Sequence, residues 1–263
     1  MSTVSLWDAH AHIQPPWYSQ KEITALIEDC QKNAIEGFIN NISNPVKADY
    51  ERGLVLADKY AMVHTNFGLQ PTEATDDNLR IFKEFATNYQ EKICAIGEVG
   101  LDYYWVKDQN MLAKQEEVFR ACIETANDLQ LPLVIHSRKA ETECLNILEK
   151  MANVPVVMHG IEASEEHTNR MIDLNYSITI PTSICIRKKY KKIATKMPLE
   201  LILLETDSPF QLPFNPPAGQ KVKNSPVNIH LSAKKLAEIK DLPFEDIARV
   251  TSTNTKTFFQ IKD

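Results

Sequence analysis

The stretch LPLVIHSRKAETECLNILEKMANVPVVMHG, residues 131–160, contains one complete repeat of the pattern that decides the fold. Two short apolar runs, 131–136 and 154–159, flank a longer segment, 140–150, whose apolar residues recur at helical spacing. Both runs are continuously apolar rather than alternating, which is typical of strands in a parallel sheet with both faces covered. Each run also ends in a histidine.

The same alternation of strand and helix extends along the chain. Apolar or β-branched runs predict eight strands, at 4–8, 37–42, 61–67, 92–97, 131–136, 154–159, 176–180 and 201–206. Amphipathic stretches predict helices at 21–33, 45–60, 76–90, 111–130, 140–150, 164–173, 186–196 and 226–240, with two shorter ones at 243–250 and 254–260. Eight strand–helix units in about 250 residues are typical of a (β/α)8 TIM barrel.

No boundary between domains is visible in the sequence. The proline-rich stretch 208–219 lies between the last strand and the last major helix, so it reads as a long loop of one strand–helix unit. A doubly wound open sheet fits less well, because no glycine-rich phosphate motif follows the first strand. We therefore expect residues 1–263 to form a single α/β domain.

Composition narrows the class of protein. The chain is 43% hydrophobic, enough for a large core, and its net charge of -6 excludes a global basic field that would gather polyanions. Five scattered cysteines make a poor disulfide framework and favour a reducing compartment. With no signal peptide and no apolar run near the roughly 20 residues of a membrane span, we expect a cytoplasmic monomer without membrane or protein partners.

Metal-ligand residue types follow the predicted strands at six positions. In a TIM barrel the C-terminal ends of the strands form one face, and active sites are built there. The six side chains are His10 and His12 after the first strand, Glu98 after the fourth, His136 and His159 at the ends of the fifth and sixth, and Asp207 after the eighth.

The ligand types indicate a particular chemistry. Four imidazoles and two carboxylates suit Zn, Mn, Co or Ni better than Ca. Six ligands exceed what one tetrahedral zinc uses, whereas two ions about 3.5–4 Å apart use them naturally. Glu98 is the candidate bridge and Asp207 the candidate general base. One ion takes His10, His12, Glu98 and Asp207, and the other takes Glu98, His136 and His159.

Each of these residues also has a structural interpretation. The histidines fit buried, hydrogen-bonded core residues, and Glu98, between two glycines, fits a surface charge at a turn. Asp207, ahead of Ser208 and Pro209, fits a turn-forming residue. The shared position at strand ends favours the metal site over these separate explanations.

Five motifs together resemble the TatD family of metal-dependent deoxyribonucleases, within the amidohydrolase superfamily. They are DAHAH (8–12), IGEVGLDYYW (96–105), QEEVFRACIETANDLQLPLVIHSR (115–138), VVMHG (156–160) and LLETDSPF (203–210), in family order across about residues 6–260. The resemblance implies a TIM barrel, Mg, Mn or Zn as the working ion, and hydrolysis of DNA phosphodiester bonds, often from the 3′ end. It also implies the same six metal ligands.

The sequence departs from the family pattern at three places. Gln70 stands where the family usually has a histidine, which puts a further metal and exonuclease efficiency in doubt. The loop HGIEAS (159–164) keeps the histidine but differs after it. In VKNSP (222–226) Lys223 replaces an arginine, and lysine cannot hold a phosphate with a bidentate pair of hydrogen bonds.

Substrate-binding candidates surround the predicted site. Arg138 and Lys223 are candidates for phosphate contacts, with a surface ion pair to Glu141 or Glu143 as the alternative for Arg138. Gln70 and the aromatic run Tyr103–Trp105 are candidates for contacts with the nucleotide. For the aromatic residues, covering the barrel mouth is the slightly favoured alternative. The run RKKYKK (187–192) fits either a nucleic-acid contact or a solvated helix face.

Three functions are therefore open at the level of sequence. The first is a two-metal DNA phosphodiesterase. The second is a hydrolase of an ester, lactone or amide, including a D-aminoacyl-tRNA, on the same centre; the acidic net charge and Gln70 favour it modestly. The third, a binding scaffold without catalysis, is disfavoured because all six ligand positions are intact.

Overall fold

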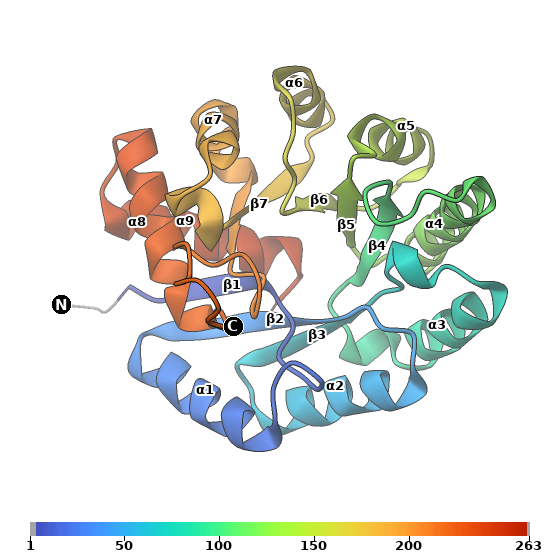
Figure 1. Cartoon of the computed structure of the whole chain (residues 1–263), viewed down its shortest axis with the longest axis horizontal. Helices are drawn as coiled ribbons and strands as arrows, with labels where there is room; N and C mark the ends of the chain where they lie inside the picture. Colours follow the sequence, from blue (N-terminus) through green and yellow to red (C-terminus); the bar gives the residue numbers. More distant parts are fainter. Residues whose placement is uncertain (1–3, 262–263) are drawn as a thin grey trace.

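The computed structural model describes residues 4–261, and within them eight parallel strands form one sheet in the order β1 to β8, surrounded by helices (Figure 1). The strands are β1 (Leu6–Ala11), β2 (Ile35–Ile42), β3 (Val63–Phe67), β4 (Ile96–Asp102), β5 (Leu133–Arg138), β6 (Val156–His159), β7 (Ser177–Pro181) and β8 (Ile202–Glu205). The helices are α1 (Gln20–Lys32), α2 (Lys47–Lys59), α3 (Asp76–Asn88), α4 (Gln109–Leu129), α5 (Glu141–Met151), α6 (Glu165–Asp173), α7 (Lys188–Lys196), α8 (Ile229–Lys240) and α9 (Phe244–Phe258). The predicted (β/α)8 TIM barrel is confirmed.

Backbone hydrogen bonds between β1 and the segment after β8 close the ring. The Asp207 N–H donates to the His10 carbonyl at 2.9 Å, and the His12 N–H donates to the Ser208 carbonyl at 2.7 Å. The buried Asp8 carboxylate reinforces this seam by accepting bonds from the Thr206 amide and hydroxyl, at 2.9 and 2.5 Å. Closure of the barrel therefore also places three of the predicted ligands side by side.

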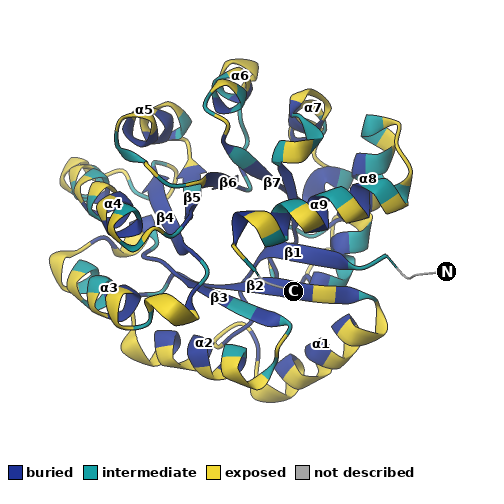
Figure 2. Cartoon of the chain, turned by 180° about the vertical axis from the view of Figure 1, so that it is seen from behind, coloured by how far each residue is buried: buried dark blue, intermediate teal, exposed yellow. Residues whose placement is uncertain are grey.

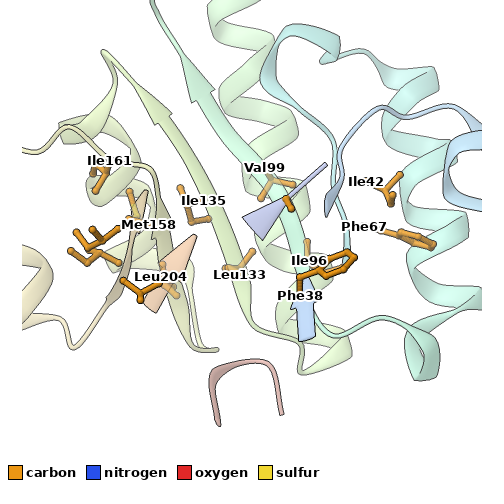
Figure 3. Packing of buried hydrophobic residues seen from close by; sticks show 14 of the residues in the cluster. Phe38, Ile42, Phe67, Ile96, Val99, Leu133, Ile135, Met158, Ile161 and Leu204 are labelled. Carbon is orange, nitrogen blue, oxygen red and sulfur yellow. The ribbon is translucent and has the colours of Figure 1, made fainter. Parts of the chain in front are cut away.

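The core has two parts. The larger cluster fills the layer between the strands and the helices, whose buried faces point inward in Figure 2 and whose packing Figure 3 shows around Phe38, Ile96 and Leu133. The smaller cluster combines alternate, inward-facing strand residues with the C-terminal end of α9; it contains Ala9, Ile39, Ala95, Val134, Val157, Leu203, Phe258 and Phe259. Helix α9 thus packs against the strands of the barrel itself.

Three predictions of strand and helix bounds differ most from the structure. The first strand runs over Leu6–Ala11 instead of 4–8, so His10 lies within it. The fourth runs over Ile96–Asp102 instead of 92–97, because residues 90–92 form a 3-10 turn before it. The two short helices predicted at 243–250 and 254–260 are one helix, α9.

The threonines of α9 explain the last error. They interrupt the sequence pattern, yet the Thr251 hydroxyl donates to the Ile247 carbonyl at 2.8 Å and the Thr255 hydroxyl to the Thr251 carbonyl at 2.9 Å. Bonds to carbonyls four residues back satisfy these side chains inside a helix.

We expect Phe259→Ala to lower the free energy of unfolding by about 3–5 kcal/mol, the usual cost of a deleted core aromatic ring. Phe259 is 2% exposed and belongs to the inner cluster. The control is Phe214→Ala, since Phe214 is 45% exposed. Urea unfolding followed by circular dichroism measures both, and equal small losses would contradict the role assigned to the inner cluster.

Candidate metal centre

The six predicted ligands come together at the C-terminal ends of the strands. His10, Glu98, His136 and His159 lie within β1, β4, β5 and β6, and His12 and Asp207 lie just beyond β1 and β8. Potential ligand atoms approach within 4.8 Å of one another in three groups. These groups are His10, His12 and Glu98; Glu98, His136 and His159; and His10, His159 and Glu205.

The Glu98 carboxylate lies between two pairs of imidazoles. Its Oε2 is 3.8 Å from the Nε2 atoms of both His10 and His12. Its Oε1 is 2.6 Å from His136 Nδ1 and 3.7 Å from His159 Nε2. Each carboxylate oxygen therefore faces a different histidine pair, which is the arrangement that a carboxylate bridging two cations requires.

Asp207 joins the first of these pairs. Its Oδ1 lies 3.5 Å from His12 Nε2 and 3.9 Å from His10 Nε2. The residue has a φ of 51°, in the left-handed region that aspartate tolerates better than most side chains. The backbone turn that closes the barrel thus also directs the Asp207 carboxylate toward the centre.

Two glycines let the backbone approach this centre closely. A Cβ on Gly68, after β3, would lie 2.2 Å from the Glu98 nitrogen, and one on Gly100 would lie 1.9 Å from the His136 carbonyl oxygen. Gly100 also has a φ of 149°, which side chains disfavour. Larger residues at either position would push apart the strands that carry Glu98 and His136.

Three outer contacts fix the orientation of the imidazoles. The His12 Nδ1–H donates to the Asn41 carbonyl at 3.1 Å. Carboxylate oxygens of Glu205 and Asp102 lie 2.7 Å from His159 Nδ1 and 3.0 Å from His136 Nε2. Each contact leaves the other ring nitrogen facing Glu98, and such partners orient and strengthen metal-binding histidines.

Sequence reasoning missed these outer partners. Asp102 and Glu205 are acidic residues inside the motifs GLDYY and LLETD, so their position near strand ends was an available signal. The Asn41 contact uses a backbone carbonyl, which no residue pattern indicates.

Electrostatics favour an ionised carboxylate at the centre. Burial by itself raises the pKa of Glu98, but the His136 hydrogen bond and the surrounding imidazoles hold that pKa well below its ordinary value. Burial also opposes charge on His136 and His159, yet the carboxylates of Asp102 and Glu98 raise the pKa of His136 to about 9, and Glu205 raises that of His159 to about 10. Protons on His136 and His159 thus supply positive charge that stabilises the ionised Glu98 carboxylate.

His10 behaves differently. Burial, followed by repulsion from His159 and His12, holds the pKa of His10 well below its ordinary value, so this ring is neutral and able to donate a lone pair. Its ring stacks on that of His159, with centroids 3.6 Å apart. Among the described residues, buried His10 Nδ1 and Glu205 Oε1 make no hydrogen bond. Nitrogen and carboxylate donors with unsatisfied atoms fit a divalent transition metal.

A cavity of about 1070 Å³ opens above the centre. His12, Glu98, His136, His159 and Asp207 line its floor. Its aromatic walls include two pairs of neighbouring rings, Trp17 with Phe210 and Tyr104 with Trp105, whose centroids are 5.0 and 4.9 Å apart. The cavity has room for a substrate the size of a nucleotide.

The model of the family described as TatD related DNase matches residues 7–260. The chain belongs to this family. A Bacillus subtilis relative, described as the uncharacterized metal-dependent hydrolase YabD, is 30% identical over 97% of this chain and 99% of its own length. The human deoxyribonuclease TATDN3 is 27% identical over 97% of this chain and 95% of its own.

Solved structures agree with the assignment. The Escherichia coli TatD homologue YjjV superposes with a TM-score of 0.85 at 25% identity, covering 98% of each chain. This TatD-family protein is thus a metal-dependent hydrolase, consistent with the histidine and glutamate groups at its barrel mouth. Across the described helices, we find none with the length and apolar content needed to cross a membrane.

Two of the four predicted substrate-binding residues line the cavity. Arg138 and Gln70 line the cavity of this TatD-family protein. No ion pair joins Arg138 to Glu141 or Glu143 in the described structure; instead its guanidinium lies 4.2 Å from the centroid of the Tyr104 ring. An arginine stacked on an aromatic ring keeps its hydrogen-bond donors available for a phosphate.

Tyr103 and Lys223 are not brought to the cavity. The Tyr103 hydroxyl donates to Glu116 on α4 at 3.3 Å, and its neighbours Tyr104 and Trp105 line the cavity instead. The Lys223 amine donates to Glu22 on α1 at 2.6 Å. Both side chains thus point toward helices. Residue type alone did not predict these hydrogen-bond partners.

We expect Asp102→Ala to weaken metal binding by about 10–100-fold, the usual cost of removing an outer partner of a ligating histidine. The change frees the His136 ring from its contact at 3.0 Å. Metal titration followed by elemental analysis measures the effect, with exposed Asp128→Ala on α4 as the control. Equal metal affinity in both variants would show that Asp102 does not orient His136.

Proposed function

We propose that this TatD-family hydrolase cleaves phosphodiester bonds of DNA, using two divalent ions held on either side of Glu98. The observation that carries the proposal is the orientation of the Glu98 carboxylate: one oxygen faces His10 and His12, and the other faces His136 and His159. Two-metal centres bridged by a carboxylate are suited to in-line displacement at phosphorus.

The two ions are assigned by proximity. His10, His12, Glu98 and Asp207 would hold one, and Glu98, His136 and His159 would hold the other. When bound, such ions lower the pKa of a coordinated water and neutralise charge on a phosphate oxygen. Zn, Mn and Mg are the candidate ions: the mixed imidazole and carboxylate set suits Zn and Mn, and the family resemblance adds Mg.

The protein's own residues supply the remaining steps. The Asp207 carboxylate, near His12, accepts the proton of the attacking water as general base. Arg138, held over the Tyr104 ring, donates hydrogen bonds to the substrate phosphate. Gln70, which follows β3 and also lines the cavity, offers an amide to the nucleotide. Together they orient the phosphate above the Glu98 carboxylate.

The finer features rest on the family resemblance and on composition. Removal of nucleotides from the 3′ end follows the activity that the family motifs imply. A reducing compartment such as the cytoplasm is supported by the five cysteines, all of which are unpaired in the structure. That the protein works as a monomer stays a prediction. The human relative's description as a deoxyribonuclease supports DNA as the substrate.

A parallel assay of a DNA oligonucleotide, a lactone and a D-aminoacyl-tRNA, each with Mn, Mg or Zn, tests the proposal. We expect DNA to be cleaved fastest, with mononucleotides released from the 3′ end. Hydrolysis of a carbonyl substrate without DNA cleavage in any metal would assign the centre to ester, lactone or amide chemistry instead.

Glu98→Ala should remove bound metal and turnover together, because both ions share this carboxylate. We expect turnover to fall by more than about 100-fold, since loss of an outer contact alone costs about 10–100-fold. Elemental analysis and the DNA assay measure the two effects on the same sample. Exposed Glu124→Ala on α4 is the control; a Glu98→Ala protein that keeps two ions and full activity would refute the bridge.

A further inference from the structure

The lysines and arginines of the cavity wall are confined to one side of the barrel mouth. Among the described lining residues they are Arg138 at the end of β5, Lys139 directly after it, and Arg187 and Lys189 after β7. The lining residues contributed by the loops after β1, β2, β3, β4 and β8 include no lysine or arginine. A polyanion entering the cavity is therefore attracted to the β5–β7 side.

The positive charge continues beyond the cavity onto α7. Arg187 precedes this helix, and Lys188, Lys189, Lys191 and Lys192 lie in its first turns. The helix stands on the outer ring next to α6 and α8 (Figure 1). The chain as a whole carries a net charge of -6, so this concentration of positive charge is local.

Nearby carboxylates neutralise only part of the cluster. Glu162 accepts bonds from both Arg187 and Lys189, at 2.8 and 2.7 Å. Within residues 4–261, Lys188, Lys191 and Lys192 have no acidic partner, and Lys188 and Lys192 are exposed. Lysines left unpaired on a surface are available to phosphates.

Helix α7 is a fixed support rather than a loose tail. Tyr190 is 1% exposed, and its hydroxyl donates to the Gly160 carbonyl, directly after β6, at 2.9 Å. Ile193 and Ala194 on the same face are also buried. The lysines are therefore held at a set place relative to His159 and the metal centre, since Gly160 is its neighbour in the chain.

We propose that the DNA strand carrying the scissile phosphate leaves the cavity over the β5–β7 side and continues along α7, with its phosphates on Lys188, Lys191 and Lys192. The inference rests on the proposed nuclease function and adds the path of the strand beyond the active site. It makes substrate length a determinant of affinity, because a short strand ends inside the cavity and never reaches α7.

The test compares a trinucleotide with a single strand of about 20 nucleotides as substrates for wild type and for Lys188→Glu/Lys192→Glu. We expect the variant to raise KM for the long strand by about tenfold and to lower the salt slope of log KM by about 1.4, or about 0.7 for each lost phosphate contact. The ratio of KM between short and long strands should fall toward one.

A matched control carries the same charge change elsewhere. Lys59→Glu/Lys150→Glu alters lysines in the last turns of α2 and α5, just before β3 and β6, at the opposite end of the barrel. We expect it to keep the wild-type preference for the long strand. If both double variants lost the preference for the long strand equally, the effect would come from net charge alone, and the proposed path along α7 would be wrong.

The outcomes separate this inference from the nuclease proposal. If wild type cleaves DNA but Lys188→Glu/Lys192→Glu keeps the full length preference, the path along α7 is wrong and the proposed function stands. If wild type cleaves neither DNA substrate in any metal, both fail. Metal content measured on every variant shows that the centre itself is unchanged.

Discussion

A buried carboxylate shared by four imidazoles is the constraint on which the site depends. An ionised carboxylate loses its hydration when buried, so Glu98 needs positive charge on both of its oxygens. In the absence of an ion, protonated His136 and His159 supply much of this charge, whereas His10 stays neutral. In our proposal two cations would supply it. Because β4 must bring Glu98 to this point, Gly68 and Gly100 are needed where neighbouring backbone lies too close for a side chain.

The same segments of the chain close the barrel and form the site. The hydrogen bonds that join β1 to the segment after β8 involve His10, His12 and Asp207, whose side chains form one half of the centre. At the other end of the barrel, Phe258 and Phe259 of α9 pack against inward-facing strand residues. The structure thus combines an apolar end that stabilises the barrel with a polar end where burying charge costs free energy but makes metal chemistry possible.

Much of this arrangement was predictable because it follows from periodicity and chain order. Eight apolar runs that end in polar residues predict a parallel barrel, and the barrel brings His136 and Asp207 to one face. Strand bounds were less predictable. Residues 92–97 have the sequence pattern of a strand, yet a 3-10 turn ends at residue 92 and β4 begins only at Ile96, so Glu98 lies inside the strand. The partners of Asp102, Tyr103 and Lys223 depend on side-chain direction, which only packing against α1, α4 and β5 decides.

The central claim is that Glu98 lies between two metal ions. Anomalous diffraction from crystals grown with Mn²⁺ tests it most directly, because it locates each ion without reference to activity. We predict two peaks about 3.5–4 Å apart, one on the His10 and His12 side of the carboxylate and one on the His136 and His159 side. A single peak, or a pair of peaks of which neither contacts Glu98, would contradict it.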